Sequence, residues 1–195
     1  MSASTRRVLS AIAMFVAAVS LQRACTMTWG GTRALGGVRY EFSVIGLSRL
    51  QATDVSPAAR IDCRWWPAYG DAALCAPGEA GEVPGARLRL AYPLLQVGLW
   101  LAIVSLLLHA LRVPRDWRMQ AALPTLVLLL TASGVVLARQ GLHRGLAALA
   151  GLELSFNGAG YWFAMFAATL GLASLLLLIG TTPPASPPPG GPAHR

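Results

Sequence analysis

The sequence predicts a membrane α-helical protein, a bundle of four transmembrane helices with a small extracytoplasmic antiparallel β-sheet in the first external loop. Three observations predict this fold class. Of the 195 residues, 55% are hydrophobic and only 12% are charged, whereas a soluble domain usually carries about 25% charged residues. Four long apolar stretches divide the chain, and a segment with alternating polar and apolar residues separates the first two of them.

The first apolar stretch covers residues 8–21 and follows a pair of arginines. As a helix it would be about 21 Å long, and a span needs about 20 residues. We therefore expect the helix to continue to Trp29, with Arg23 extending to the membrane surface. A cleaved signal peptide has the same basic start and short apolar core, but residues 21–25 lack the small residue that a cleavage site needs at the third position before the cut. Residues 1–29 are expected to form the N-terminus and a retained helix.

The other apolar stretches are longer. Residues 92–180 are expected to form three more helices, at 92–111, 121–138 and 161–179. Pro124 would lie in the first turn of its helix, where a missing N–H costs little, and the aromatic residues 161–163 would form a belt at one membrane interface. The proline-rich residues 181–195 are expected to form a disordered tail.

The distribution of charge predicts both the environment and the orientation of the chain. The net charge is +8, but residues 28–91 carry seven arginines against six acids, so most of the excess lies beside the apolar stretches. A nucleic-acid-binding protein would cluster its charge on a folded domain, and we expect no nucleic-acid partner. Arg112, Arg115 and Arg118 crowd one short loop. This predicts that the loop and both termini lie in the cytoplasm, on one side of a plasma or inner membrane.

Residues 30–91 are expected to form an extracytoplasmic, β-rich domain. Polar and apolar side chains alternate over residues 38–45 and 86–90, which is the pattern of a half-buried strand. Residues 60–65 are a third candidate strand, and residues 152–156, in the second external loop, are another. Glycine and proline clusters separate these segments. The pattern predicts a small antiparallel sheet of three or four strands.

A disulfide is expected to stabilise this small domain. Cys25, Cys63 and Cys75 permit three pairings. Cys63 and Cys75 both lie in the segment expected outside the cytoplasm, where thiols oxidise, and their loop would stabilise the fold by about 3 kcal/mol. We favour the Cys63–Cys75 pairing. A redox pair or a metal site is not expected, because the chain has no Cys-x-x-Cys motif and no histidine near these cysteines.

This arrangement resembles the claudin and peripheral-myelin-protein group of tetraspan membrane proteins. In that family a tryptophan follows the first helix, a Gly-Leu-Trp motif and two disulfide-bonded cysteines come next, and a final strand lies in the second external loop. The corresponding features here are Trp29, Gly46 with Leu47, Cys63 with Cys75, and residues 152–156. Ser48 stands where the motif has its tryptophan. The resemblance implies a binding or junction-type role.

The sequence offers no convergent set of catalytic or cofactor-binding groups. His109 and His143 are expected at opposite membrane faces, about 30 Å apart, and His194 lies in the tail, so they cannot share a metal or a haem. The apolar stretches also lack the buried acids and bases that mark ion pathways. We expect no enzyme activity, no cofactor and no metal site.

Small residues spaced by four occur in two of the apolar stretches. Ala13 with Ala17, and Ala167 with Gly171, favour close helix packing within the chain or between copies of it, as in a homo-oligomer. Gly141 and Gly145 have the same spacing but are expected outside the third helix.

Trp65, Trp66 and Tyr69 are the candidate contact residues for a partner. Adjacent strand residues point to opposite faces, so one tryptophan is expected in the core and the other at a partner surface or the bilayer interface. We therefore expect a non-enzymatic membrane protein whose disulfide-bonded external domain binds a protein partner or organises the membrane. The alternative is an accessory subunit of a transporter or envelope enzyme complex.

Overall fold

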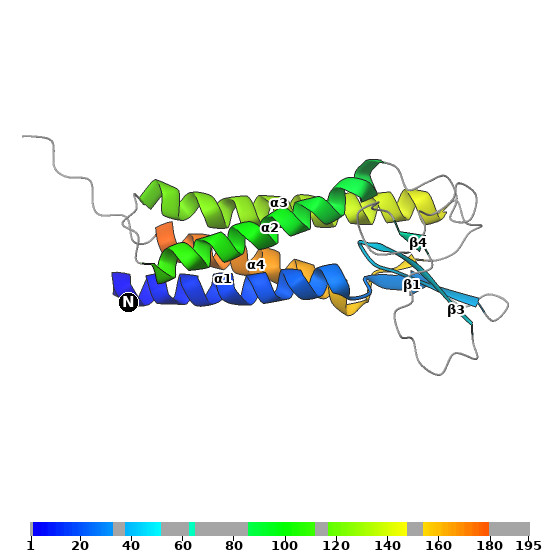
Figure 1. Ribbon diagram of the computed structural model, residues 1–195, viewed down its shortest axis with the longest axis horizontal. Helices are drawn as coiled ribbons and strands as arrows, with labels where there is room; N and C mark the ends of the chain where they lie inside the picture. Colours follow the sequence, from blue (N-terminus) through cyan, green and yellow to red (C-terminus); the bar gives the residue numbers. More distant parts are fainter. Residues whose placement is uncertain are drawn as a thin grey trace, which may run out of the picture.

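The computed structural model describes residues 2–32, 38–51, 63–64, 86–111, 117–147 and 154–179. These residues form four helices, which lie side by side in a bundle, and five short strands, which form a sheet at one end of it (Figure 1). α1 packs against α2 and α4, and α3 packs against the same two helices, so the helices form a closed ring. The amino terminus lies at the end of the bundle opposite the sheet (Figure 1).

The four apolar stretches of the sequence are confirmed as helices. They are α1 (Ala3–Thr26), α2 (Ala86–Ala110), α3 (Trp117–Ala147) and α4 (Ala159–Ile179). Each is long and apolar enough to cross a membrane, since a span needs about 20 residues. α3, with 31 residues, is about 46 Å long at 1.5 Å per residue, and it reaches alongside the sheet (Figure 1).

Local signals set both ends of α1. The Ser2 hydroxyl accepts a hydrogen bond from the Thr5 amide at 3.2 Å, which satisfies one of the free amides of the first turn. At the other end, Met27 turns to an extended conformation and donates its amide to the Arg23 carbonyl at 2.9 Å. The helix thus ends before Trp29, which belongs to the connection between helix and sheet.

The start of α2 corrects one strand prediction. Residues 86–90 alternate between apolar and basic side chains, but they form the beginning of α2. The Arg87 guanidinium donates a hydrogen bond to the Gln140 side chain of α3 at 3.1 Å, so this part of α2 packs against a neighbouring helix. A helix satisfies its own backbone groups without a partner strand, and five residues are too few for periodicity to separate the two structures.

α3 extends beyond the predicted 121–138 at both ends. Pro124 therefore lies in the helix interior instead of the first turn, and Gly141, His143 and Gly145 lie inside the helix instead of beyond it. The predicted boundaries followed the apolar residues alone. A helix can continue beyond them because its backbone groups bond within the helix, and Gln140 in the added part accepts a hydrogen bond from Arg87 of α2.

The sheet has five antiparallel strands in the order β4-β3-β2-β1-β5. They are β1 (Gly30–Thr32), β2 (Val38–Phe42), β3 (Gly46–Gln51), β4 (Cys63–Arg64) and β5 (Leu154–Ser155). β2, β4 and β5 fall within predicted strand segments, whereas β1 and β3 were not expected. Gly31 of β1 lies opposite both Glu41 and Ser155, so the segment before α4 completes the sheet.

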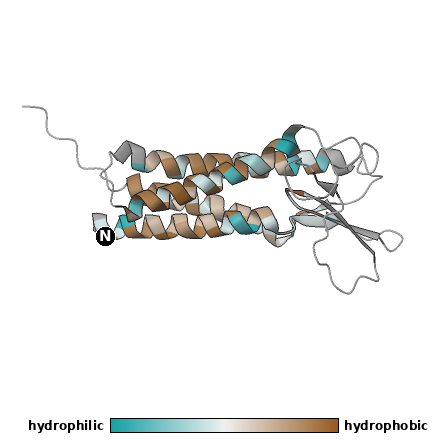
Figure 2. Cartoon of the chain, in the orientation of Figure 1, coloured by the Kyte–Doolittle hydropathy of each residue, from teal (hydrophilic) through white to brown (hydrophobic). Residues whose placement is uncertain are grey.

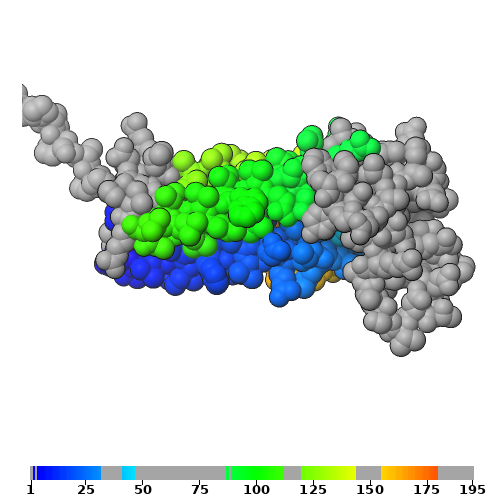
Figure 3. All heavy atoms as spheres, viewed as in Figure 1, coloured from blue at the N-terminus to red at the C-terminus, as the bar shows by residue number. Residues whose placement is uncertain are grey.

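The outward faces of the helices are apolar. Phe15, Trp100, Leu129 and Leu176 are each more than half exposed, whereas large apolar side chains of a soluble bundle point inward. The helices are mostly apolar along their length, with polar residues toward the sheet (Figure 2), and α1 and α2 form one continuous face (Figure 3). Such a surface suits a lipid environment.

The fully buried polar residues of the described bundle are all serine or threonine. Ser10 of α1 and Ser174 of α4 have their hydroxyl oxygens 2.7 Å apart, which is the kind of hydrogen bond that joins transmembrane helices. The buried hydroxyls of Ser105 and Thr131 have no partner within the described ranges. None of the acids, arginines and histidines whose side chains the structure describes is buried.

Candidate functional site

The candidate site is the region where the sheet meets the bundle, because aromatic rings and the thiol of Cys25 gather there. We define the sheet–bundle junction as Cys25, residues 27–30, 42–46, Tyr92, Gln96 and residues 156–161. It contains the end of α1, the β2–β3 hairpin, the first turns of α2 and the segment that enters α4. Its geometry determines how the sheet is held on the four helices.

Backbone hydrogen bonds tie the end of α1 to both partners. The Trp29 amide donates to the Phe42 carbonyl of β2 at 2.7 Å, and the Trp29 carbonyl accepts from the Gly158 amide at 3.0 Å. The Thr28 carbonyl accepts from the Gly160 amide of α4 at 2.8 Å. This short connection is therefore hydrogen-bonded to β2 and to the start of α4, as the buried backbone of a packed interior requires.

Three glycines make this close approach possible. A Cβ at Gly160 would lie 2.6 Å from the Met27 carbonyl oxygen and 2.6 Å from the Trp29 ring. A Cβ at Gly30 would overlap the Ser155 carbonyl oxygen, and one at Gly158 would overlap the carbonyl oxygen of Thr28. Only a residue without Cβ fits at these positions unless the backbone moves.

An aromatic cluster fills the space behind the backbone contacts. Trp29 is fully buried, and its indole N–H donates to the Ala24 carbonyl at 2.8 Å. Its ring meets Tyr161 edge to face with centroids 5.9 Å apart, and Phe42 meets Phe156 in the same way at 5.3 Å. Edge-to-face pairs at such distances add to the free energy gained by burial. Trp29, where the sequence led us to expect the end of the first helix, is therefore a core residue of the connection between α1 and the sheet.

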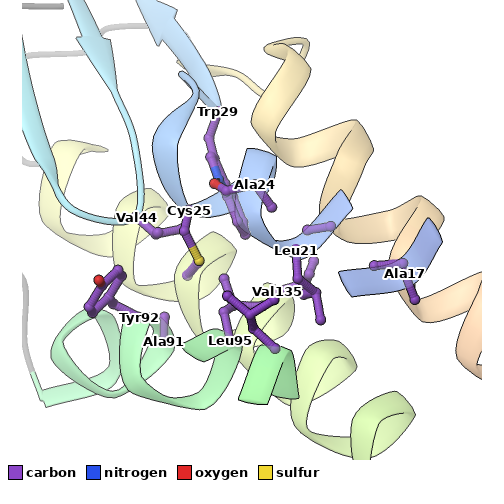
Figure 4. Packing of buried hydrophobic residues seen from close by; sticks show 14 of the residues in the cluster. Ala17, Leu21, Ala24, Cys25, Trp29, Val44, Ala91, Tyr92, Leu95 and Val135 are labelled. Atoms are coloured by element: carbon purple, nitrogen blue, oxygen red, sulfur yellow. The ribbon is translucent and has the colours of Figure 1, made fainter. Parts of the chain in front are cut away.

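The tip of the β2–β3 hairpin enters the end of the bundle. The Ser43 amide donates to the Gly46 carbonyl at 2.9 Å, and the Ser43 hydroxyl accepts from the amides of Ile45 and Gly46, each at 3.2 Å. This turn places Val44 and Ile45 at the tip, where they are 0% and 4% exposed. Val44 lies near Cys25 of α1 in the packed core (Figure 4).

A short polar chain lies among these apolar residues. The Gln96 amide group donates to the Tyr92 hydroxyl at 3.0 Å, and Gln96 is also hydrogen-bonded to the Cys25 thiol. Cys25 is buried and forms no disulfide. Two of the three cysteine pairings that the sequence permits are therefore absent, because both of them require Cys25.

The junction is a packed structural connection between the sheet and the helices. Within the described ranges, no three of the His, Cys, Asp and Glu residues come close enough to hold a metal ion. His109 and His143 lie toward opposite ends of the bundle, in the last turn of α2 and in the part of α3 near the sheet. The junction instead combines a continuous core, aromatic pairs and satisfied backbone groups, which hold a sheet rigidly.

Most of the site residues predicted from the sequence lie outside the described ranges. They are Trp65, Trp66, Tyr69 and Cys75. The backbone of Cys63 is described in β4, where it pairs with Leu47 of β3. The Cys63–Cys75 disulfide and the three partner-contact residues therefore stay predictions. Sequence reasoning missed the junction itself, and the signal that could have found it is the pair Gly158 and Gly160 just before the last apolar stretch.

β4 forms one edge of the sheet and is shorter than its neighbour. It pairs with Gly46 and Leu47 of β3, and in the described part of the chain no strand pairs with the outer edge of residues 48–51. Trp65 follows β4 directly in sequence. Unpaired edges are the places where sheets accept an additional strand.

Comparison with known proteins found no family model that matches the chain and no curated protein with significant sequence similarity to it.

Proposed function

We propose that this chain is a non-enzymatic integral membrane protein whose sheet lies outside the cytoplasm and binds a protein partner. One observation carries the proposal: the hydrophobic core runs without a break from Met14 in the bundle to Phe42 and Val44 in the sheet. A sheet that shares its core with spanning helices keeps a fixed orientation to the membrane. Fixed orientation lowers the entropic cost of docking a partner.

The proposed contact surface is the β4 edge together with the predicted contact residues Trp65, Trp66 and Tyr69. Tryptophan and tyrosine are typical of the energetic centre of an interface, and Trp65 and Trp66 directly follow in sequence β4, the strand next to β3. A Cys63–Cys75 disulfide, as proposed from the sequence, would close the loop that carries these aromatic residues and so limit its freedom.

Two features support a relation to the claudin and peripheral-myelin-protein group. The tryptophan after the first helix, Trp29, is the buried centre of the junction. The final strand expected in the second loop is represented by β5, which pairs with β1. A binding or junction-type role, which that resemblance implies, agrees with a sheet mounted on a four-helix bundle.

The orientation rests on the connection between α2 and α3. It contains Arg112 and Arg115, and Arg118 follows in the first turn of α3. Arginines concentrated in a short connection favour the cytoplasmic side. Because the amino terminus lies at the same end of the bundle (Figure 1), it is proposed to be cytoplasmic, and the sheet is then outside.

A site-specific photo-crosslinker tests the partner proposal. Placed at Trp66 in native membranes, it is expected to give a discrete heavier product that mass spectrometry identifies as the chain joined to a different protein. The matched control carries the same group at Phe15, which faces outward from α1 with 59% exposure, and is expected to give lipid adducts only. If neither the Trp66 variant nor the Phe15 variant gave a protein adduct, the proposal would be contradicted.

A specific observation favours the alternative, an accessory subunit of a transporter or envelope enzyme complex. Trp100 lies near the middle of α2 and is 62% exposed, although tryptophan usually lies at the membrane interfaces. A helix of another subunit would cover it. A protein adduct from a crosslinker at Trp100 but not at Trp66 would support this alternative over the external partner.

A further inference from the structure

The four helices carry the whole net charge of the chain. They contain eight arginines and no acid. The remainder of the sequence holds the other eight arginines and all eight acids, so it has no net charge. The excess positive charge is thus confined to segments that span or border the membrane, and its position along them can be read from the structure.

Four of these arginines are exposed near the sheet end of the bundle. We define the arginine belt as Arg23, Arg87, Arg89 and Arg139, all exposed. They come from three helices: Arg23 lies in the last turn of α1, Arg87 and Arg89 at the start of α2, and Arg139 in the last third of α3. The polar ends of these helices are visible toward the sheet (Figure 2).

Contacts between elements hold parts of the belt together. The Arg87 guanidinium donates to the Gln140 side chain at 3.1 Å, which joins the α2 and α3 sections. The Arg139 guanidinium lies over the Phe156 ring, 5.9 Å from its centroid, so it is placed at the base of the sheet. Planar guanidinium groups that stack and form hydrogen bonds in this way keep a defined orientation.

The belt borders the lipid-facing surface. On each of the three helices, a large apolar side chain is exposed on the bundle side of the arginines. Val19 on α1, Leu90 on α2 and Val136 on α3 are 47–53% exposed. When the apolar outer face lies in the hydrocarbon core, charged side chains just beyond that face lie at the depth of the lipid headgroups. The belt therefore lies where phosphate groups are found.

The positive charge at the amino-terminal end of α2 favours binding of an anion there. Arg87 and Arg89 stand at its amino-terminal end, where the helix dipole is already positive, and a cation there is unfavourable. The α2 sequence contains no acid that could offset them. Two oxygens of one phosphate group can accept two parallel hydrogen bonds from one guanidinium group, which makes arginine well suited to phosphate.

We propose that the arginine belt binds the headgroups of anionic phospholipids in the leaflet next to the sheet. The inference rests on the proposed membrane placement and adds to it a preference for one class of lipid. Bound phosphates would neutralise charge at the base of the sheet and fix the depth of the bundle in the membrane. An acidic protein segment is the competing occupant, and the test separates the two.

The test compares lipid preference between variants of the full chain in nanodiscs. Brominated lipids quench tryptophan fluorescence on contact, and competition between brominated phosphatidylglycerol and phosphatidylcholine gives the relative affinity. The wild type is expected to prefer phosphatidylglycerol. The Arg87→Gln/Arg89→Gln/Arg139→Gln variant is expected to lose this preference by about fivefold for each arginine removed. The Arg6→Gln/Arg7→Gln variant, changed at the opposite end of the bundle, is the matched control and should keep the preference.

Two readouts keep the outcome decisive. Insertion into nanodiscs of phosphatidylcholine alone reports the membrane placement, so failure there counts against the proposed function and not against lipid selectivity. If the triple variant does not fold, Arg89→Gln alone replaces it. Equal affinity of the wild type for both lipids, or equal loss in the belt and control variants, would overturn the inference. Neutralisation of the belt by an acidic segment of the chain itself would produce the first of these results.

Discussion

Three glycines let the backbone between α1 and β1 lie directly against the entry to α4. Gly30, Gly158 and Gly160 occur where a Cβ would meet a carbonyl oxygen or the Trp29 ring. The close approach in turn places Trp29 so that its indole N–H reaches Ala24. At the scale of single residues, the position of the sheet therefore depends on the three glycines, which have no Cβ, as much as on the large buried side chains.

A substitution at Gly160 tests this dependence. Gly160→Ala places a methyl group 2.6 Å from the Met27 carbonyl oxygen and from the Trp29 ring, so the backbone must move, and overpacking of this kind costs about 1–3 kcal/mol. The melting temperature of the purified protein in detergent is expected to fall.

The matched control is Gly98→Ala, also a helical glycine. Its Cβ would meet Thr131 at 3.4 Å and Leu21 at 3.8 Å, which are ordinary contacts, and alanine favours a helix over glycine by about 1 kcal/mol. Gly98→Ala is expected to leave the melting temperature unchanged or raise it. A Gly160→Ala protein that melts at or above the wild-type temperature would disprove the role given to the glycines.

At the scale of elements, the β2–β3 hairpin acts as a plug in the end of the bundle. Turns usually carry polar residues and glycine, but Val44 and Ile45 occupy this one and are buried. Ser43 supplies the hydrogen bonds that a turn of apolar residues lacks. The hairpin therefore couples the sheet to the helices by burial of its tip.

Val44→Asp tests the plug. A carboxylate at a fully buried tip would have to leave the core or lose its charge, so the hairpin is expected to lift from the bundle. Hydrogen exchange should show faster amide exchange in β2, β3 and β1, while the middle of α2 and α3 keeps its protection. Asn157→Asp adds the same charge at an exposed residue near the sheet and should change little. Unaltered exchange in the Val44→Asp hairpin would contradict the coupling.

The elements differ in how well the sequence predicts them, and the difference has a physical cause. The four helices follow from length and apolar composition, because lipid imposes helical structure on any such segment. β2 follows from its alternation. β1, with the sequence Gly-Gly-Thr, has two glycines that disfavour a strand, and β2 and β5 pair with it on both sides. Residues 86–90 alternate like a strand, yet they are helical, and Arg87 among them bonds to Gln140 of α3.

The candidate site was less predictable than the helices. Its main residues are far apart in the sequence: Trp29, Phe42 and Phe156 meet only because the first and last helices are adjacent. A tryptophan beside an apolar stretch has the same local sequence pattern whether it faces lipid or a sheet, so burial of Trp29 depends on tertiary contacts. The sequence could indicate close backbone approach through Gly158 and Gly160, but not the partner segment.

At the scale of the whole molecule, two properties coincide along one axis. The outward faces of the helices are apolar over their middle, and arginines are exposed toward both ends, including Arg7 at one end and Arg139 at the other. The sheet lies beyond one of these ends (Figure 1). In the proposed membrane placement, this layout sets the depth of the bundle and the side of the sheet, on which the proposed partner and lipid contacts both depend.

The accessibility of epitope tags in cells tests this layout most directly. Tags are placed before Met1, after Arg195 and in the loop at Gly78, and antibody binding is compared in intact and permeabilised cells. The proposed layout predicts that the tag at Gly78 is stained in intact cells and that both terminal tags are stained only after permeabilisation. Terminal tags on opposite sides, or a loop tag hidden until permeabilisation, would contradict it.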